Sequence, residues 1–310
     1  MMNLSDYDDK KIKVVLKDGS TFEGFGAHNS FEYSSCEFGI DAECLQIRDY
    51  LIREEEIARV ELIEAEPSIR RTEEDMAMIF SVKRSFSDHL KRWEDNELPD
   101  KYDHNCFEYS AQPTREEFER ALEHQRERGD KFIKLEGNFP LADDFGLSAG
   151  VTLTMRLFGS ADDWKVNDQI QIKKPRYKDI KEIELKHFGR AYGEDFTVRN
   201  ADRLFEYLDY KGAYIGDKLV GAYYFFSSDG YTCVDGLIVD EEYRHSYIAT
   251  TLLKHAVSEA AGNVVFLHAD MDDTPREMYE RMGFREVDRL YEYLSVDLES
   301  LPHSGGSTRP

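Results

Sequence analysis

The chain has 310 residues, a length that favours two domains or three small ones. Hydrophobic residues make up 41% of it and aromatic residues 13%, which indicates folded cores and argues against wholesale disorder. Lys and Arg number 40 against 63 Asp and Glu, so the net charge is −23 and the surface repels phosphate backbones. General nucleic-acid binding is therefore disfavoured, and cationic partners are favoured.

The sequence shows no signal for a membrane or for export. Its longest apolar run, Leu219–Phe226, has eight residues, whereas a membrane-spanning helix needs about twenty. The N-terminus is polar and lacks the basic region and apolar core of a secretion signal. The four cysteines, Cys36, Cys44, Cys106 and Cys233, form no CxxC pair. We therefore expect a cytoplasmic protein with reduced thiols and no membrane partner.

Residues 1–66 have the pattern of a small all-β unit. Ile12, Val14 and Leu16 alternate with polar residues, and Asp18-Gly19 is a strong hairpin turn because Gly tolerates positive φ. The predicted strands are residues 11–17, 21–25, 44–48 and 57–63. The pattern KIKVVLKDGSTFEGFG, ending in IARVELIE, resembles the Sm-like barrel. Such units often bind RNA, but this one is acidic without a basic stripe, so a structural or interaction role is favoured.

The middle segment, residues 67–167, is predicted to be an α/β domain that follows a linker at Glu64–Pro67. Acidic residues after Thr72 face the positive end of a helix dipole, and a helix is predicted from there to Trp93. Thr114 and Glu117 have capping-box spacing at the start of a second helix, which ends at Gly129. Strands are predicted at residues 131–135 and 150–158.

The last third alternates strands and helices, and Gly216-Asp217 forms a tight turn between two strands. The strand 264–269 is apolar and is expected to be buried on both faces. Residues 301–310 are rich in Ser, Gly and Pro and are expected to be disordered. The predicted strands are residues 169–173, 231–239, 264–269 and the segment from 284, together with a strand, a turn and a second strand within residues 214–221. The predicted helices are residues 177–188, 248–260 and 274–282.

One junction carries candidate chemistry. The strand that ends at Val239 leads through an acidic turn into the helix that begins at Ile248. Backbone N–H groups before a helix, together with the helix dipole, form an anion site suited to pyrophosphate, and Arg244 adds positive charge. This argument alone is weak, because most strand–turn–helix junctions bind nothing.

This junction, with the later segment DDTPREMYERMGF, resembles the GNAT superfamily of N-acetyltransferases. In that family an Arg/Gln-x-x-Gly-x-Gly/Ala loop holds the pyrophosphate of acetyl-CoA, and a Tyr-x-x-x-Gly-Phe segment places a tyrosine beside the thioester sulfur. Here the loop is Arg244–Ala249 and the tyrosine is Tyr279. The resemblance covers residues 168–298, which implies a GNAT domain with a mixed central sheet flanked by helices, and leaves 299–310 as a tail.

The helix–strand pair of the middle segment echoes that of the GNAT-like segment. The resemblance therefore extends to a tandem arrangement in which the middle unit is a degenerate GNAT-like half. That half lacks the cofactor loop and its Arg. An unrelated α/β domain remains the alternative.

Two positions depart from the family pattern. Tyr247 stands where Gly is usual; it keeps its N–H, but its side chain must point away from the phosphate. Asp272 stands where many members have an Asn that bonds the pantetheine arm, and Asp accepts that bond without donating one. The resemblance implies these cofactor-binding residues: Leu237, Ile238, Val239, Arg244, His245, Ser246, Tyr247, Ile248, Ala249, Thr250 and Asp272.

Acetyl transfer to an amine needs a base, support for the oxyanion, and an acid for the departing thiolate. The resemblance implies a main-chain N–H at Ile238 for the oxygen and Tyr279 as the acid. Asp235 is the candidate base, because it interrupts an apolar strand and alternation places it on the face of Cys233 and Leu237. A structural carboxylate is the alternative. Cys233 itself is interpreted as a core residue.

The first hypothesis is an N-acetyltransferase that moves the acetyl group of acetyl-CoA to a primary amine of a cationic small molecule or peptide. The second is a catalytically silent GNAT-like module that binds a ligand or partner. A third and weaker hypothesis is an RNA-associated protein. No paired His/Cys spacing or HExxH motif indicates a metal. The acceptor identity and the oligomeric state, a homodimer included, are left open.

Overall fold

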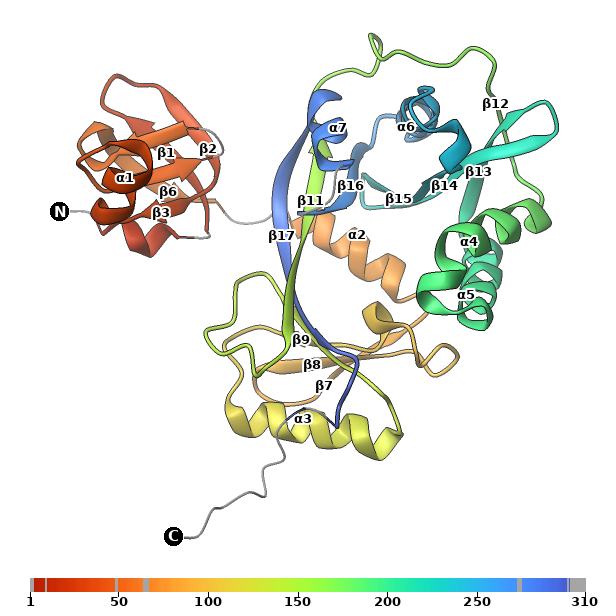
Figure 1. Ribbon diagram of the computed structural model, residues 1–310, viewed down its shortest axis with the longest axis horizontal. Helices are drawn as coiled ribbons and strands as arrows, with labels where there is room; N and C mark the ends of the chain where they lie inside the picture. The colour runs from red at the N-terminus through yellow and green to blue at the C-terminus, as the bar shows by residue number, and fades with distance from the viewer. Residues whose placement is uncertain are drawn as a thin grey trace.

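In the computed structural model, residues 3–8, 10–47, 50–63, 67–271, 275–299 and 301 are described. They form a small N-terminal unit, at the left of Figure 1, and a larger α/β body built on one mixed sheet. Residues 64–66 of the predicted linker, and the predicted tail beyond residue 301, lie outside the described residues. Among the described residues, no helix is long and apolar enough to cross a membrane.

The N-terminal unit consists of two three-stranded sheets with the orders β2-β1-β6 and β3-β4-β5. Its core packs Leu4, Ile12, Val14 and Leu45 together. The predicted strands are all present, but no pairing among the described residues closes the two sheets into one barrel, so the Sm-like barrel stays a prediction. Its elements are η1 (Leu4–Tyr7), β1 (Lys11–Leu16), β2 (Thr21–Phe25), β3 (Ala27–Asn29), α1 (Phe31–Phe38), β4 (Cys44–Ile47), β5 (Tyr50–Arg53), η2 (Glu54–Glu56) and β6 (Ile57–Leu62).

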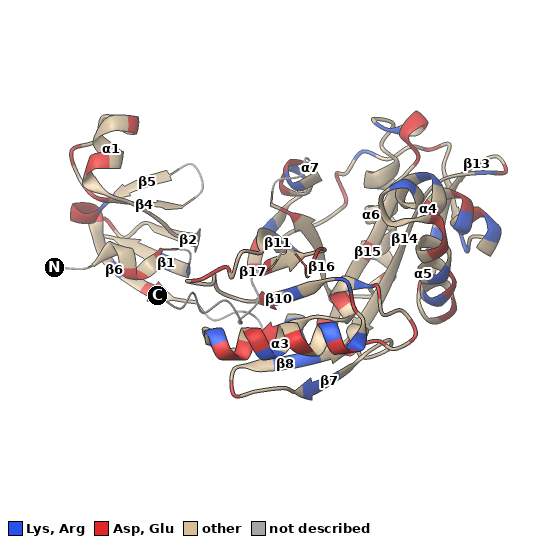
Figure 2. Ribbon diagram, turned by 60° about the horizontal axis from the view of Figure 1, so that its bottom comes forward, with Lys and Arg blue, Asp and Glu red and all other residues tan. Residues whose placement is uncertain are grey.

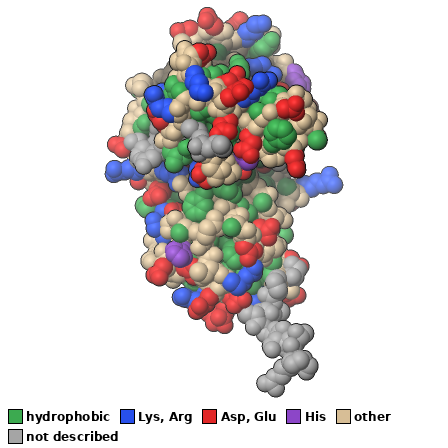
Figure 3. Space-filling model, turned by 90° about the vertical axis from the view of Figure 1, so that its left-hand side faces the viewer, with side chains coloured by type: hydrophobic (Ala, Val, Ile, Leu, Met, Phe, Trp, Pro, Cys, Tyr) green, Lys and Arg blue, Asp and Glu red, His purple; other side chains and the backbone are tan. Residues whose placement is uncertain are grey.

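Figure 3 looks onto the end of the molecule where this unit lies. On that face, acidic and basic side chains are interspersed with apolar ones rather than gathered by sign. A mixed surface of this kind agrees with the sequence-based preference for a structural or interaction role, because nucleic-acid binding calls for a basic stripe.

The larger body contains an eleven-stranded sheet of order β12-β13-β14-β15-β16-β11-β17-β10-β9-β8-β7. The fold is the mixed α/β architecture that the sequence predicts. Its strands are β7 (Val82–Ser85), β8 (Leu90–Glu94), β9 (Phe107–Tyr109), β10 (Ile133–Gly137), β11 (Ser148–Leu157), β12 (Gln171–Lys173), β13 (Asp209–Ile215), β14 (Lys218–Ser228), β15 (Tyr231–Val239), β16 (Val264–Asp270) and β17 (Phe284–Ser295). Its helices are α2 (Pro67–Ala77), η3 (Tyr102–His104), α3 (Arg115–Arg128), α4 (Tyr177–Tyr192), α5 (Glu194–Tyr207), η4 (Glu241–Tyr243), α6 (Ile248–Glu259) and α7 (Pro275–Arg281).

The sheet order is a palindrome. Exchanging β7 with β13, β8 with β14, β9 with β15, β10 with β16 and β11 with β17 returns the same order reversed, apart from the edge strand β12. In both parts a helix, α3 or α6, connects a strand to its parallel neighbour. We call residues 67–157 the middle half and residues 171–295 the C-terminal half. This internal repetition supports the tandem interpretation of the middle segment.

The two long strands β11 and β17 join the halves, as Figure 1 shows in its centre. β11 belongs to the middle half by sequence but pairs with β16, and β17 belongs to the C-terminal half but pairs with β10. They also pair with each other over ten residue pairs. Each of the two strands therefore completes the sheet of the other half. The domain boundary predicted between residues 167 and 168 stays a prediction, because the sheet runs without a break across both halves.

Helices cover both faces of the C-terminal half. α6 and α7 pack on one face, over Leu153, Val234 and Leu267. On the other face α4 and α5 pack over Tyr210 and Tyr224, beside α2 with its buried Ile69. The apolar side chains that alternate along β14, β15 and β16 serve these two cores.

One helix prediction for the larger body was wrong, and one of its helices was missed. The helix predicted from Thr72 to Trp93 ends at Ala77, and the rest of that stretch forms β7 and β8. Pairing of β8 with β9 buries Leu90 and Trp93, so long-range packing overrides the local helical pattern. The helix α5 was not predicted at all, although Ala201 and Leu204 lie on its buried face.

Candidate active site

The strands β15 and β16 diverge at the centre of the C-terminal half. They pair in parallel from Tyr231 to Val234 and separate beyond Val234. Gly236 has a φ of +60° and lies in a bulge, because Asp235 and Ile238 are opposite Tyr224 and Ala222 on β14. A Cβ at position 236 would collide with the Tyr224 ring, so only glycine fits there.

This bulge corrects one prediction. Strict alternation placed Asp235 on one face with Cys233 and Leu237. Cys233 instead packs with the core beneath α2, while Leu237 packs with the core beneath α6. The extra residue shifts the alternation, and it lets side chains from both faces reach the gap between the strands.

A pocket of about 260 Å³ fills this gap. Three of the predicted residues on β15, Asp235, Leu237 and Ile238, line it, as does Tyr279 from α7. The remaining wall comes from Phe188, Val234, Gly236, Leu253, Leu267, His268, Ala269, Asp270 and Pro275. The structure therefore brings the two predicted catalytic residues to one cavity. A larger hollow, of about 540 Å³, runs along the charged face of α3 and contains none of the predicted residues.

Asp235 is half-buried and held in place by two hydrogen bonds. Its Oδ2 accepts from the Tyr224 hydroxyl at 3.0 Å and its Oδ1 from the Gly236 N–H at 2.7 Å. Burial raises the pKa of Tyr224 well above its ordinary value, so the phenol stays a donor to this carboxylate. The carboxylate is thus fixed in direction, which suits a group that meets a substrate amine.

Tyr279 is 7% exposed, and its ring packs edge-on against Phe284 at 5.9 Å between centroids. Its helix α7 ends at Arg281, and Gly283 follows with a φ of +93°. The first residue of the predicted helix, Thr274, and the predicted cofactor residue Asp272 lie outside the described residues. Within the described part of α7, the buried ring sets the direction of the Tyr279 side chain.

The segment from Arg244 to Thr250 forms the predicted loop and the first turn of α6. The backbone N–H groups of residues 245–250 have no hydrogen-bond partner among the described residues. Six consecutive amides without a partner at the positive end of a helix form a cradle for an anion. Arg244 is 53% exposed beside it and pairs with Glu241 at 3.4 Å.

Neighbouring side chains hold the loop in this shape. Asn167 donates from Nδ2 to the Ser246 carbonyl at 2.9 Å. Thr251 donates from Oγ1 to the Tyr247 carbonyl at 2.7 Å and accepts the Asn167 N–H at 2.9 Å. At the entry to the loop, buried Asp240 accepts from Lys186 at 2.7 Å. The carbonyls are thereby occupied, while the amides stay open.

His245 and Tyr247 adopt left-handed backbone, with φ of +62° and +59°. For a residue with a Cβ this conformation costs roughly 1–2 kcal/mol. The Tyr247 side chain is 52% exposed and the residue makes no side-chain cap for α6. The expectation that this side chain points away from the cradle fits its exposure. Strain kept at two positions of one loop is typical of a functional segment.

Two residues at this site were missed by the sequence reasoning. His268 lines the pocket, and its Nε2 lies 3.4 Å from Oε1 of Glu73 on α2, which also accepts from Thr154 on β11 at 3.3 Å. The strand 264–269 was interpreted as apolar throughout, and the histidine that interrupts it was the overlooked signal. Glu184 on α4 is 6% exposed, and burial raises its pKa to about 7, with the Asp235 charge adding to the shift.

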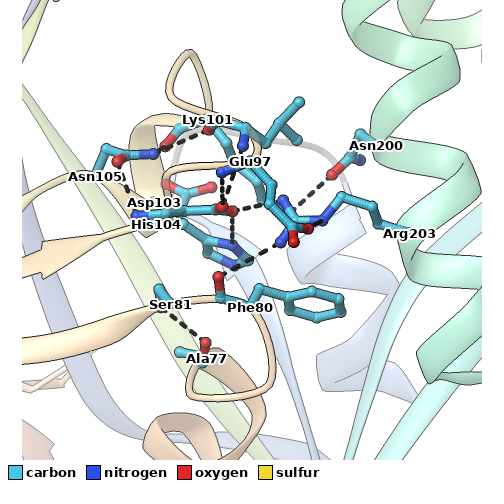
Figure 4. A network of polar contacts seen from close by, with 12 residues as sticks. Ala77, Phe80, Ser81, Glu97, Lys101, Asp103, His104, Asn105, Asn200 and Arg203 are labelled. Atoms are coloured by element: carbon cyan, nitrogen blue, oxygen red, sulfur yellow. Dashed lines mark hydrogen bonds and ion pairs between the residues drawn. The ribbon is translucent and has the colours of Figure 1, made fainter.

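A polar network, drawn in Figure 4, joins the middle half to α5 of the C-terminal half. Arg203 on α5 donates to Asp95 at 2.6 Å, and Lys101 donates to Asn200 on α5 at 3.0 Å. Burial lowers the pKa of Lys101, against the effect of neighbouring carboxylates that include Asp235. The network therefore fixes α5 against the middle half and brings one ammonium close to the Asp235 side of the site.

The middle half has no comparable cradle. At the start of α3 the Thr114 Oγ1 accepts the Glu117 N–H at 3.2 Å, and Glu117 accepts the Thr114 N–H at 2.9 Å. This is the predicted capping box, and it satisfies amides with the protein's own side chains. Figure 2 shows acidic and basic residues interleaved along the ribbon of α3. The predicted loss of the cofactor loop from this half fits these contacts.

Comparison with known proteins identifies the architecture. Residues 177–284 match the model of the acetyltransferase (GNAT) family, roughly a third of the chain. No curated protein matches the chain by sequence. A solved structure of a functionally unknown conserved protein from Staphylococcus epidermidis is 19% identical, with a TM-score of 0.62 over 70% of this chain and 94% of that one.

A GCN5-related N-acetyltransferase from Kribbella flavida is 12% identical, with a TM-score of 0.53 over 74% of this chain and 94% of that one. At these identities the likeness shows a shared fold. Both structures cover about twice the share of the chain that the family model matches, so the shared fold extends well beyond residues 177–284.

Proposed function

Because residues 177–284 form a domain of the GNAT family, we propose that the chain is an N-acetyltransferase that uses acetyl-CoA and a primary amine. One observation carries the proposal: the open amides of residues 245–250 lie at the end of the strand whose bulge opens the pocket lined by Asp235 and Tyr279. An anion cradle next to a cavity with a fixed carboxylate and a phenol is what transfer from a diphosphate-bearing thioester requires.

The residues fit this donor. The amides of residues 245–250, with Arg244, would hold its pyrophosphate, and Leu237, Ile238 and Val239 would lie along its pantetheine arm. Val239 pairs with Gly221 and does not line the pocket, so its part is limited to the backbone. When bound, acetyl-CoA supplies an activated acetyl group. The main-chain N–H at Ile238 is the proposed support for the thioester oxygen.

The proposed proton transfers use two side chains. Asp235 attracts the acceptor amine and takes its proton as the new N–C bond forms. The Tyr279 hydroxyl gives a proton to the departing sulfur. Direct attack is favoured over a covalent enzyme intermediate, because Cys233 is fully buried and burial raises the pKa of its thiol well above the ordinary value.

The acceptor is proposed to be cationic in solution. Asp235 and Glu184 place two carboxylates on the α4 side of the site, and the net charge of the chain is −23. Such a field raises the local concentration of ammonium ions. An ammonium must lose one proton to solvent before the neutral amine attacks, and Asp235 takes the second proton as the N–C bond forms.

A thermal unfolding scan with acetyl-CoA tests the donor, and release of free coenzyme A thiol with an amine panel tests the reaction. A donor at a hundred times its Kd stabilises the fold by about 2.7 kcal/mol. We expect Tyr279→Phe to lower kcat roughly a hundredfold while the stabilisation by acetyl-CoA is kept. No stabilisation at millimolar acetyl-CoA overturns the proposal. Stabilisation without thiol release indicates the catalytically silent module instead.

A further inference from the structure

Three residues spaced by four form one stripe along α4: Glu184, Phe188 and Tyr192. Their exposed fractions rise along the stripe, from 6% at Glu184 to 37% at Phe188 and 57% at Tyr192. The stripe therefore runs from the buried face of the sheet, past the pocket, to solvent.

The inner end of the stripe is acidic. Glu184 forms no ion pair with a described residue, and the buried Tyr210 hydroxyl lies beside its carboxyl group. The charged groups that face Glu184 are Asp235 on β15 and Lys101 from the middle half. Two carboxylates against one ammonium leave room for one more positive charge.

The middle of the stripe is a wall of the pocket. The Phe188 side chain lines the same cavity as Asp235 and Tyr279. A substrate amine that reaches Asp235 must therefore pass the Phe188 ring. An aromatic face attracts both apolar groups and cations.

The outer end continues the aromatic surface. The centroid of the Phe188 ring lies 6.1 Å from that of Tyr192, which lies 6.1 Å from that of Phe196 on α5. Tyr102, from the middle half, faces Tyr192 closely enough for the two phenols to interact electrostatically. An exposed row of rings continuous with a pocket marks a ligand-binding surface rather than scattered apolar residues.

We propose that the acceptor is a small primary amine on an apolar, ring-bearing body. Its ammonium binds between Asp235 and Glu184, and its body lies along Phe188 and Tyr192. This inference rests on the proposed acetyltransferase function and narrows its substrate class. Polyamines and amino alcohols are the alternatives that the experiment separates, because they carry polar groups where the stripe offers rings.

The experiment measures kcat/KM for 2-phenylethylamine, 1,4-diaminobutane and ethanolamine with acetyl-CoA and the full chain. We expect 2-phenylethylamine to be favoured about tenfold or more, since one ring–ring contact and its buried area account for that factor. Phe188→Ala and Tyr192→Ala should each lower this preference about three- to tenfold, and Phe188→Leu should keep part of it. The stabilisation by acetyl-CoA should not change.

Tyr207→Ala is the matched control, because Tyr207 is 56% exposed on α5 and packs against Phe80 instead of the stripe. It should leave the preference unchanged. A preference for 1,4-diaminobutane or ethanolamine, or equal effects of Phe188→Ala and Tyr207→Ala, overturns the inference and leaves the acetyltransferase proposal standing. Absence of both turnover and calorimetric binding of 2-phenylethylamine to the coenzyme A-bound protein also overturns it. If acetyl-CoA does not stabilise the unmodified chain against unfolding, the proposed function itself is refuted.

Discussion

The helices α3 and α6 occupy equivalent places in the palindromic sheet, yet they begin in opposite ways. At α3, Thr114 and Glu117 bond each other's backbone amides. At α6, Tyr247 makes no side-chain cap, and the amides of residues 245–250 have no partner among the described residues. One fold thus contains a capped helix start at α3 and an uncapped one at α6. The missing cap distinguishes the half that holds the candidate site.

The two halves also differ in how they treat a buried carboxyl group, as the pKa values of Glu117 and Glu184 show. Burial acts to raise the pKa of Glu117, but hydrogen bonds from Ser87, Thr114 and His89 outweigh it and lower the pKa to about 2. At Glu184 burial dominates, and the pKa rises to about 7. A carboxylate held by several hydrogen bonds supports the fold when it is charged, whereas one whose burial outweighs its hydrogen bonds opposes folding when it is charged.

A negative charge introduced at the uncapped start of α6 should have the largest effect on the difference between the two helix starts. Tyr247→Asp places a carboxylate at the cradle, where Asp tolerates left-handed backbone. Because the side chain at position 247 is directed to solvent, its carboxylate would lie roughly 6 Å from a bound phosphate. At an effective dielectric of about 20 this repels the phosphate by about 3 kcal/mol, so we expect coenzyme A affinity to fall about a hundredfold. Calorimetric titration checks this. The matched Tyr247→Asn variant should bind far more tightly, and equal affinities of the two would contradict the cradle.

Glu184→Gln should stabilise the fold at pH 8 by up to about 3 kcal/mol. The folded pKa of about 7 lies above the ordinary value of 4.5, so the carboxylate opposes folding as the pH rises from 4.5 to 7. The gain should therefore vanish at pH 4.5, as thermal unfolding at both pH values can show. The same variant should weaken amine binding. A gain that does not depend on pH would mean that packing, and not charge, is responsible.

Glu117→Gln should change the free energy of unfolding in the opposite direction and destabilise the fold. The folded pKa of about 2 lies below the ordinary 4.5, so the carboxylate stabilises the fold above pH 4.5, and this stability is lost as the pH falls toward 2. We expect a loss of about 2 kcal/mol at neutral pH, typical of hydrogen bonds to a charged group, with no change in coenzyme A binding. Denaturant unfolding at pH 7 and pH 3 measures it, and the deficit of the variant should shrink at the lower pH.

Thr114→Ala removes the other partner of the closed start. It should cost about 1 kcal/mol of unfolding free energy, the usual value for an N-cap, and leave acetyl transfer unaffected. If it impairs cofactor binding, then the middle half takes part in the site in a way that its contacts do not indicate.

The smallest expected effect is a gain from Tyr247→Gly. Glycine removes the left-handed strain but adds chain entropy to the unfolded state, so the net stabilisation should be about half a kcal/mol. Coenzyme A affinity should stay within a few-fold of the original. A large rise in affinity would show that the Tyr247 ring obstructs the cradle.

Much of the C-terminal half was determined by the sequence. The spacing of apolar residues predicted α4, α6, β15 and β17, because in each of them it follows the helix or strand period. The spacing of Arg244, Ala249 and Tyr279 within the order of strands and helices was enough to identify the family resemblance. It also predicted that Tyr279 lies at the site. Local rules failed where distant pairing decided the outcome, as in the stretch from Met78 to Trp93.

Only the tertiary structure decided which groups meet. The exchange of β11 and β17 between halves, the bulge at Gly236, and the approach of Glu73 to His268 join residues far apart in the chain. No local pattern encodes such contacts, since their energy comes from burial and strand pairing that exist only once the sheet has formed. The sequence could therefore predict an anion cradle and two proton-handling side chains. The stripe from Glu184 to Tyr192 could be proposed as a binding surface only from the tertiary structure, which places one end near Asp235 and leaves the other exposed to solvent.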